Sequence, residues 1–156
     1  MGALESASRI TPFLWFDSNA EEAVDFYLSL FRNSRKLEVF RNNGAAPGPK
    51  DGVLTIAFEL DGARFTALNG GPYSKFTDAV SFVVRCDSQD EIDYYWERLT
   101  DGGTEVACGW LRDKFGLAWQ VTPARISELL QSPKAMQAMM GMKKLVIADL
   151  ERAAQE

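Results

Sequence analysis

Hydrophobic and polar positions follow the same order twice along this chain. In each half, an apolar segment typical of a strand precedes a segment with apolar residues at i, i+3, i+4 and i+7, the spacing of an amphipathic helix. The strand patterns cover residues 10–16 and 79–86. The helical stripes are Ala23, Phe26, Tyr27 and Leu30 in the first half, and Ile92, Tyr95, Trp96 and Leu99 in the second. The repetition predicts two strand–helix units of one design.

Each predicted helix begins with the same polar pattern. Ser18 and Glu21 in the first half, and Ser88 and Glu91 in the second, match the spacing S-x-x-E. In a capping box of this kind, the two side chains bind backbone N–H groups that the first helical turn leaves free. We therefore expect both helices to start with a capping box.

Three further strand patterns follow the helix in each half. They cover residues 37–41, 53–60 and 64–69 in the first half, and 105–107, 108–112 and 117–122 in the second. Asp61-Gly62 predicts a tight hairpin between two of these strands, and Gly116 stands at the corresponding place in the second half.

This order predicts an α+β fold of two β-α-β-β-β modules, residues 10–69 and 79–123, with a cavity between them. Residues 124–156 form a predicted C-terminal helical tail, with helices at 127–130, 133–142 and 146–153. Each module is too small to fold alone, so we expect both to share a core in a single domain, 1–156. Residues 1–9 are expected to be a poorly ordered N-terminal segment.

Composition and charge exclude several classes of partner. Of the 156 residues, 46% are hydrophobic and 25% are charged, which is typical of a globular chain. The net charge is −5 and the Lys and Arg residues do not cluster, so neither nucleic acid nor an anionic membrane is an expected partner. No apolar run is long enough to span a bilayer, and residues 1–5 lack a signal-peptide pattern. Two cysteines are too few for a disulfide scaffold and predict a cytoplasmic protein.

The absence of histidine narrows the possible chemistry. A Ser-His-Asp or Cys-His arrangement is impossible, and two cysteines alone do not make a zinc site. Acid–base chemistry would fall to Asp, Glu, Tyr, Lys or Cys.

Three motifs carry a resemblance to a known family. They are Leu68-Asn69-Gly70-Gly71-Pro72, Cys108-Gly109-Trp110-x-x-Asp113-x-Phe115-Gly116-x-x-Trp119-Gln120, and Ala138-Met139-Met140-Gly141-Met142-Lys143-Lys144. With the doubled module they resemble the vicinal-oxygen-chelate superfamily (glyoxalase I, bleomycin-resistance proteins, extradiol dioxygenases), over about residues 10–153. The resemblance is to its PhnB-like branch, the 3-demethylubiquinone-9 3-methyltransferase family. It implies a bacterial homodimer with two curved half-barrels and helices on their convex faces.

The resemblance also locates the four inward positions where metal-using members hold a cation. Here they carry Thr11, Thr66, Ser81 and Gln120. Hydroxyls and one amide lack the anionic or imidazole ligands that a divalent cation needs. We therefore expect a cavity without metal or other cofactor.

The predicted ligand-binding residues each have a structural alternative. Gln120 would bind a ligand or be satisfied by backbone, and Arg85 would pair with an anion or lie in solvent at a strand end. Asp113 and its counterpart Glu59 would form an acid–base pair or shape turns. Cys108 would be a nucleophile or a small buried hydrophobe. The full set is Thr11, Trp15, Thr66, Asn69, Ser81, Arg85, Trp110, Asp113 and Gln120.

These observations favour a metal-free protein that binds a small apolar or aromatic molecule, as a binding module or as an enzyme of unassigned reaction. One alternative is a methyltransferase acting on a ubiquinone precursor, although no G-x-G-x-x-G site for S-adenosylmethionine follows a strand. A metal-dependent lyase, isomerase or dioxygenase is a third hypothesis, and a structural dimer with a filled cavity is a fourth.

Overall fold

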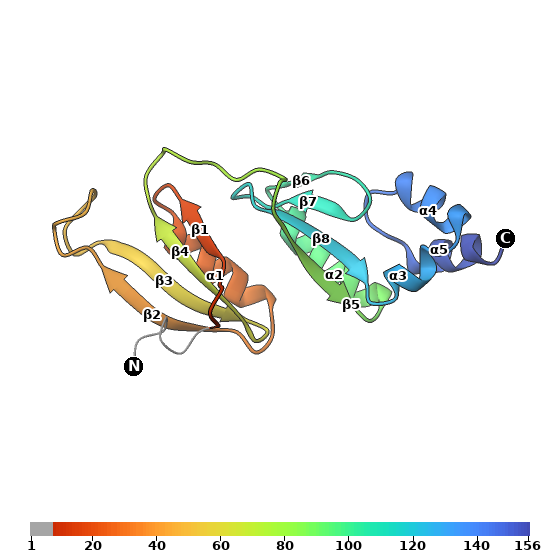
Figure 1. Ribbon diagram of the computed structural model, residues 1–156, viewed down its shortest axis with the longest axis horizontal. Helices are drawn as coiled ribbons and strands as arrows, with labels where there is room; N and C mark the ends of the chain where they lie inside the picture. Colours follow the sequence, from red (N-terminus) through yellow and green to blue (C-terminus); the bar gives the residue numbers. More distant parts are fainter. Residues whose placement is uncertain (1–7) are drawn as a thin grey trace. The chain divides into compact units, whose positions relative to one another are not determined.

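The computed structural model describes residues 8–156, which divide into two compact units, with the boundary in the chain between residues 75 and 76 (Figure 1). Residues 1–7 of the poorly ordered N-terminal segment predicted at 1–9 lie outside the described residues. The sharing of one core by both modules stays a prediction, and each unit is described by itself below.

The first unit contains one helix and a four-stranded sheet. Along the chain its elements are β1 (Phe13–Phe16), α1 (Ala20–Leu30), β2 (Arg35–Arg41), β3 (Val53–Leu60) and β4 (Ala63–Asn69). The strand order is β1-β4-β3-β2, with β1 and β4 parallel and the other pairs antiparallel.

The second unit repeats this topology. Its elements are β5 (Ser81–Cys86), α2 (Gln89–Thr100), β6 (Thr104–Glu105), β7 (Trp110–Arg112) and β8 (Ala118–Pro123), in the strand order β5-β8-β7-β6. The helices α3 (Ile126–Leu129), α4 (Pro133–Met140) and α5 (Ile147–Ala154) follow. The predicted α+β fold of two β-α-β-β-β modules with C-terminal helices is confirmed.

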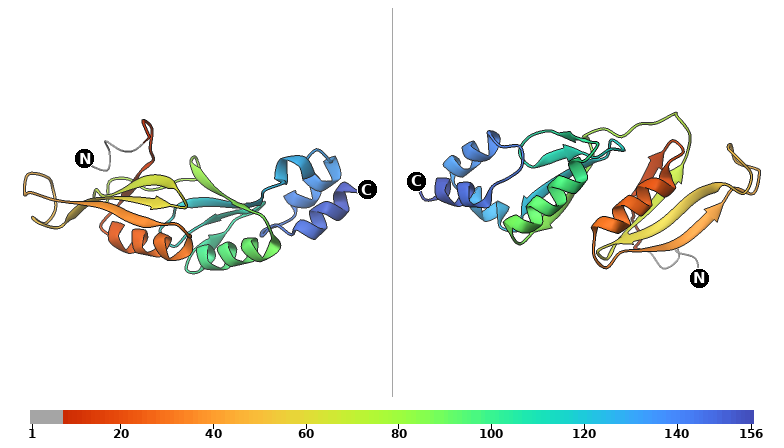
Figure 2. Two further views of the ribbon diagram at one scale, coloured as in Figure 1. Left: turned by 90° about the horizontal axis from the view of Figure 1, so that it is seen from below. Right: turned by 180° about the vertical axis from the view of Figure 1, so that it is seen from behind.

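Alternation along the strands explains why each sheet packs one face against a helix. In the first unit, Ile56 and Phe58 of β3 are fully buried, and the register places them opposite Ala67 and Phe65 of β4. The rings of Phe58 and Phe65 stack at 5.4 Å. The α1 residues Ala23, Val24 and Tyr27 are also fully buried. Figure 2 shows α1 and α2 each lying along one face of its own sheet.

The second sheet buries its helix-facing side in the same way. Trp119 and Val121 of β8 lie opposite Phe82 and Val84 of β5, and all but Phe82 are buried. The next residue in each strand points to the other side, and Val83 is 57% exposed. Trp119 therefore faces the helix side, as its position next to Gln120 predicts.

The break between β6 and β7 differs from the predicted strands at 105–107 and 108–112. Cys108 (φ 56°) and Gly109 (φ 84°) both adopt left-handed backbone conformations, which interrupt a strand. A turn hydrogen bond from Trp110 N to Ala107 O (2.9 Å) closes the interruption. The sequence pattern missed it because Cys108 is a residue that rarely adopts this conformation.

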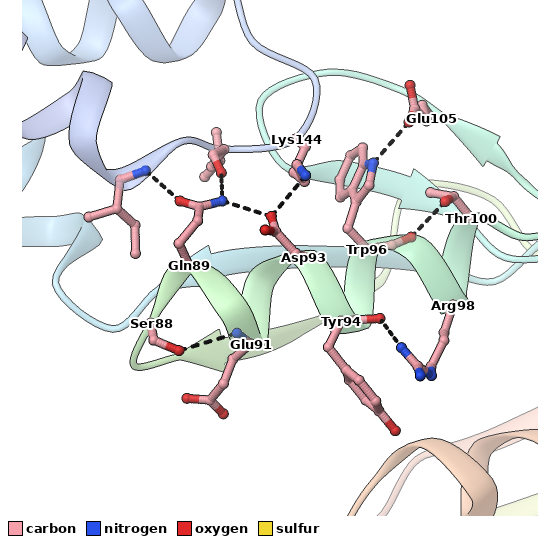
Figure 3. Close-up of polar contacts among 12 residues, drawn as sticks. Ser88, Gln89, Glu91, Asp93, Tyr94, Trp96, Arg98, Thr100, Glu105 and Lys144 are labelled. Atoms are coloured by element: carbon pink, nitrogen blue, oxygen red, sulfur yellow. Dashed lines mark hydrogen bonds and ion pairs between the residues drawn. The ribbon is translucent and has the colours of Figure 1, made fainter.

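The segment between α4 and α5 forms polar contacts with Cys108 and Gly109 and with α2. Cys108 N donates to Met142 O and Gly109 N to Lys143 O, both at 2.8 Å. On α2, the Gln89 amide joins the Leu145 carbonyl and the Ile147 N–H, and Lys144 pairs with Asp93 at 2.8 Å (Figure 3). Hydrogen bonds from Lys144 and Gln89 lower the pKa of Asp93.

The two helices begin differently, which corrects one prediction. At α2, Ser88 Oγ accepts from Glu91 N (3.2 Å) and Glu91 Oε1 accepts from Asp87 N (3.0 Å), so a capping box is present (Figure 3). At α1, the box predicted from Ser18 and Glu21 is wrong. The helix starts at Ala20, and its N-cap residue Asn19 makes no side-chain cap.

The α1 cap comes instead from Asn69 at the end of β4. Asn69 Oδ1 accepts from Ala20 N (2.8 Å), and its Nδ2 donates to the Val53 carbonyl (2.9 Å). One amide thus fixes the start of α1 to the strands β3 and β4. Sequence spacing does not reveal this contact because the donor and acceptor are 49 residues apart.

We expect Asn69→Ala to lower the free energy of unfolding by about 1–2 kcal/mol, because it removes a helix cap and leaves two backbone groups unpaired. Ser18→Ala, the matched control at the predicted cap, should change it by less than about 0.5 kcal/mol. Urea unfolding followed by circular dichroism measures both. Equal losses from the two variants would contradict the assigned cap.

Candidate functional site

Several predicted site residues lie on the face of the second sheet that points away from α2, here called the far face. Gln120 of β8 lies between Val83 of β5 and Trp110 of β7 in the strand register. Because side chains alternate along a strand, Ser81 and Arg85 share this face with Val83. The sheet therefore brings four of the predicted residues, Ser81, Arg85, Trp110 and Gln120, to one surface.

Gln120 and Ser81 are in direct contact on the far face. Gln120 Nε2 donates to Ser81 Oγ at 3.0 Å, so its partner is a side chain and not the backbone. Within the described residues, the side-chain oxygen Oε1 of Gln120 accepts no hydrogen bond. A glutamine amide has one acceptor and two N–H donors, so this pair retains hydrogen-bonding capacity for a ligand.

The two arginines of the far face differ in their partners. Arg112 forms a two-point ion pair with Asp78, with Nε to Oδ1 at 2.8 Å, and these hydrogen bonds hold the pKa of Asp78 below its usual range. Arg85 is exposed and lies opposite Thr122 in the register. In the part of the chain that the structure describes, Arg85 forms no ion pair. Its guanidinium is available to an anionic group.

In the first unit, Thr66 and Trp15 lie on the face that points away from α1. Thr66 pairs with Phe13 and is buried, and Trp15 pairs with Leu68. Thr11 precedes β1 and is half-buried. The residues that the resemblance assigns to metal positions are thus neutral in both units, and this donor set does not fit a divalent cation. No three Asp, Glu or Cys side chains gather as a metal site anywhere between residues 8 and 156.

The Asn69-Gly70-Gly71 segment packs against Trp15. The indole Nε1 donates to Gly71 O at 2.9 Å. A Cβ atom at Gly70 would lie 2.4 Å from the indole ring, so this position has no room for a side chain. Residues 70 and 71 continue the pairing of β4 with β1, and the missing side chain of Gly70 permits the ring contact.

The carboxylates predicted as counterparts have different surroundings. Asp113 is buried, and it accepts from Phe115 N (2.8 Å), Leu117 N (3.0 Å) and the Trp119 indole (2.9 Å). This contact set shapes the turn before β8. Glu59 pairs with Arg35 of β2 at 3.0 Å. A ligand-binding role for Asp113 stays a prediction, and its contacts favour the structural alternative.

The two cysteines are both unpaired and lie in different environments. Burial, together with the negative charges of Glu91 and Asp87, raises the pKa of Cys86 to about 12. Cys108 is half-buried, and its Sγ lies 3.8 Å from the sulfur of Met140.

No helix of the described chain is long and apolar enough to cross a membrane.

Comparison with known proteins identifies the family. The model of the 3-demethylubiquinone-9 3-methyltransferase family matches residues 8–122. The chain belongs to this family. The tail from residue 123 onward lies beyond the matched range, and no curated protein matches the chain.

Solved structures are similar to this chain in sequence and in fold. A PhnB protein from Bacillus cereus is 34% identical over 75% of this chain and 100% of its own, with a TM-score of 0.69. A Pseudomonas aeruginosa protein is 24% identical over 75% of this chain and 98% of its own, with a TM-score of 0.59. The fosfomycin resistance protein FosX from Listeria monocytogenes is 14% identical over 80% of this chain and 98% of its own, with a TM-score of 0.54, and shares the fold.

We expect the cysteines of this PhnB-like protein to differ widely in their rates of alkylation at pH 8. With a pKa of about 12, only about one Cys86 thiol in ten thousand is ionised at that pH. Iodoacetamide labelling followed by peptide mass spectrometry should modify Cys108 first, and Cys86 only after unfolding. Comparable rates in the folded protein would contradict the burial of Cys86.

Proposed function

We propose that this protein binds a small organic molecule on the far face of the second sheet, through Gln120, Ser81 and Trp110. The observation that carries the proposal is the hydrogen bond between the side chains of Gln120 and Ser81. It leaves the side-chain oxygen Oε1 of Gln120 without a partner among the described residues. A protein named for resistance to fosfomycin, a small molecule, shares this fold, which supports the proposal.

The surroundings of this pair indicate an apolar or aromatic ligand. Trp110 and Val83 lie on either side of Gln120 in the register, and Val83 is 57% exposed. An aromatic ring and an aliphatic side chain beside one amide suit a flat apolar body with a single polar atom. Arg85 adds a positive charge at the end of β5, where an acidic substituent of the ligand would lie.

Methyl transfer, the activity in the family's name, is a less favoured alternative. The chain has no G-x-G-x-x-G segment between a strand and a helix that would hold S-adenosylmethionine. A metal-dependent lyase or dioxygenase is also less favoured, because the four positions of the resemblance carry only hydroxyls and an amide. We further propose that the protein is a bacterial homodimer in the cytoplasm, which its unpaired cysteines suit.

The proposal can be tested with 8-anilinonaphthalene-1-sulfonate, a fluorescent aromatic anion that matches the expected ligand chemistry. We expect Trp110→Ala to weaken its binding about tenfold through loss of ring contacts, and Gln120→Ala about two- to tenfold. Ser127→Ala, at an exposed residue of α3 outside the far face, is the control and should bind like the wild type. Calorimetry with S-adenosylmethionine should give no binding heat.

Unchanged probe binding in both far-face variants would exclude this surface as the site. Micromolar binding of S-adenosylmethionine would instead favour methyl transfer.

A further inference from the structure

The first unit contains a cavity of about 450 Å³ that the function proposed above does not use. It lies where the start of α1, the loop between β2 and β3, and the segment after β4 come together, and Asp17, Asn42, Asn69 and Tyr73 are among its lining residues. Its volume is within the range of about 300–1,000 Å³ that small-molecule sites occupy. All of its lining residues belong to this one unit.

A buried asparagine holds the loop wall of this cavity in place. Asn42 is 3% exposed, and its Oδ1 accepts from Gly44 N (2.8 Å) and Ala46 N (3.3 Å). Its Nδ2 donates to the carbonyls of Ala46 (3.0 Å), Pro47 (3.3 Å) and Gly48 (3.3 Å). The loop therefore has a fixed shape before any ligand arrives.

The segment that follows β4 forms another wall of the cavity and is also fixed. Gly70 N donates to Phe16 O (2.8 Å) and Gly71 N to Asp17 O (2.9 Å), which extends the pairing of β1 with β4. The Trp15 indole holds the same segment through Gly71 O. Asn69 connects this wall to the start of α1.

The charge of the lining has one sign. Asp17 and Glu21 both line the cavity, and no Lys or Arg is among its lining residues. Within residues 8–156 neither carboxylate forms an ion pair. The cationic residues Arg41 and Lys50 of the same segment do not line the cavity: Arg41 donates to the Asp51 carbonyl (3.1 Å), and the aliphatic carbons of Lys50 lie beside Gly44.

The remaining lining is largely apolar. Pro47, Pro49 and Pro72 contribute rigid aliphatic rings, and Val53 and Leu54 lie at the start of β3. Tyr73 also lines the cavity and is 82% exposed, so its aromatic ring is accessible at the rim. The face of a tyrosine ring attracts a cation, as do the two carboxylates.

We propose that this cavity is a second binding site, for a small organic cation: an ammonium or guanidinium group carried on a short apolar body. The cationic group lies with Asp17 and Glu21, and the apolar body contacts the proline rings and Tyr73. The proposal does not rest on the function assigned to the far face of the second sheet.

Benzylamine, which is protonated at pH 7, and the uncharged benzyl alcohol are suitable probes. The Trp15 indole N–H reports on the site because it is bonded to the Gly71 carbonyl of the cavity wall, and its signal can be assigned with a Trp15→Phe variant. We expect benzylamine to shift this signal in a saturable way in ¹⁵N NMR spectra. Benzyl alcohol should bind at least tenfold more weakly.

Variants distinguish binding of benzylamine in this cavity from a nonspecific attraction of the cation to a negatively charged protein. The double variant Asp17→Asn, Glu21→Gln should weaken benzylamine binding at least tenfold. Glu21→Gln alone should weaken binding as well, by a smaller factor. Its matched control, Glu22→Gln, removes one negative charge at the next residue of α1, outside the lining, and should stay within twofold of the wild type. Gln120→Ala should have no effect on benzylamine binding. Failure of the far-face proposal can therefore be distinguished from failure of this one.

Three results would overturn the proposal: no saturable shift with benzylamine, equal binding of benzyl alcohol, or equal losses in the double variant and in Glu22→Gln.

Discussion

Each four-stranded sheet of this protein packs a single helix against one of its two faces, and the rest of the structure depends on that packing. Because side chains alternate along a strand, burying Ile56 and Phe58 under α1 turns their neighbours to the other side. The same constraint acts in the second unit, where Trp119 and Val121 are buried and Gln120 is not. The opposite face of each sheet carries most of the residues that the sequence marks as candidates for binding.

The polar contacts divide these candidates into two groups. Asp113 has three protein donors and shapes a turn, and Asn69 caps α1, so both have structural roles in the fold. Gln120 and Ser81 contact each other and keep hydrogen-bonding capacity on the far face. Arg85 also lacks an ion-pair partner among the described residues. These contacts are the reason that we propose binding by the second group, and the proposal gives them more weight than the methyl transfer in the family name.

The sequence predicted the doubled module because its signals are local: apolar alternation, helical spacing, and the Ser88–Glu91 capping box. It failed where the deciding contact is distant in the chain or depends on backbone conformation. The α1 cap is supplied by Asn69, and the β6–β7 break depends on a left-handed Cys108. The cavity lined by Asp17 and Glu21 was missed for the same reason, since three separate segments form it. Because side chains alternate along a strand, the sequence correctly places Gln120 and Trp119 on opposite faces of the sheet. The identity of the ligand leaves no such local pattern in the sequence.

Thiol labelling along β5 tests the central packing claim most directly. In a Cys108→Ser background, Val83→Cys and Val84→Cys place a thiol at adjacent positions on opposite faces, 57% and 9% exposed in the native residues. Because α2 covers only the face that carries position 84, maleimide should modify position 83 at least a hundredfold faster than position 84. Equal rates, or faster labelling at position 84, would contradict the packing from which the site is derived.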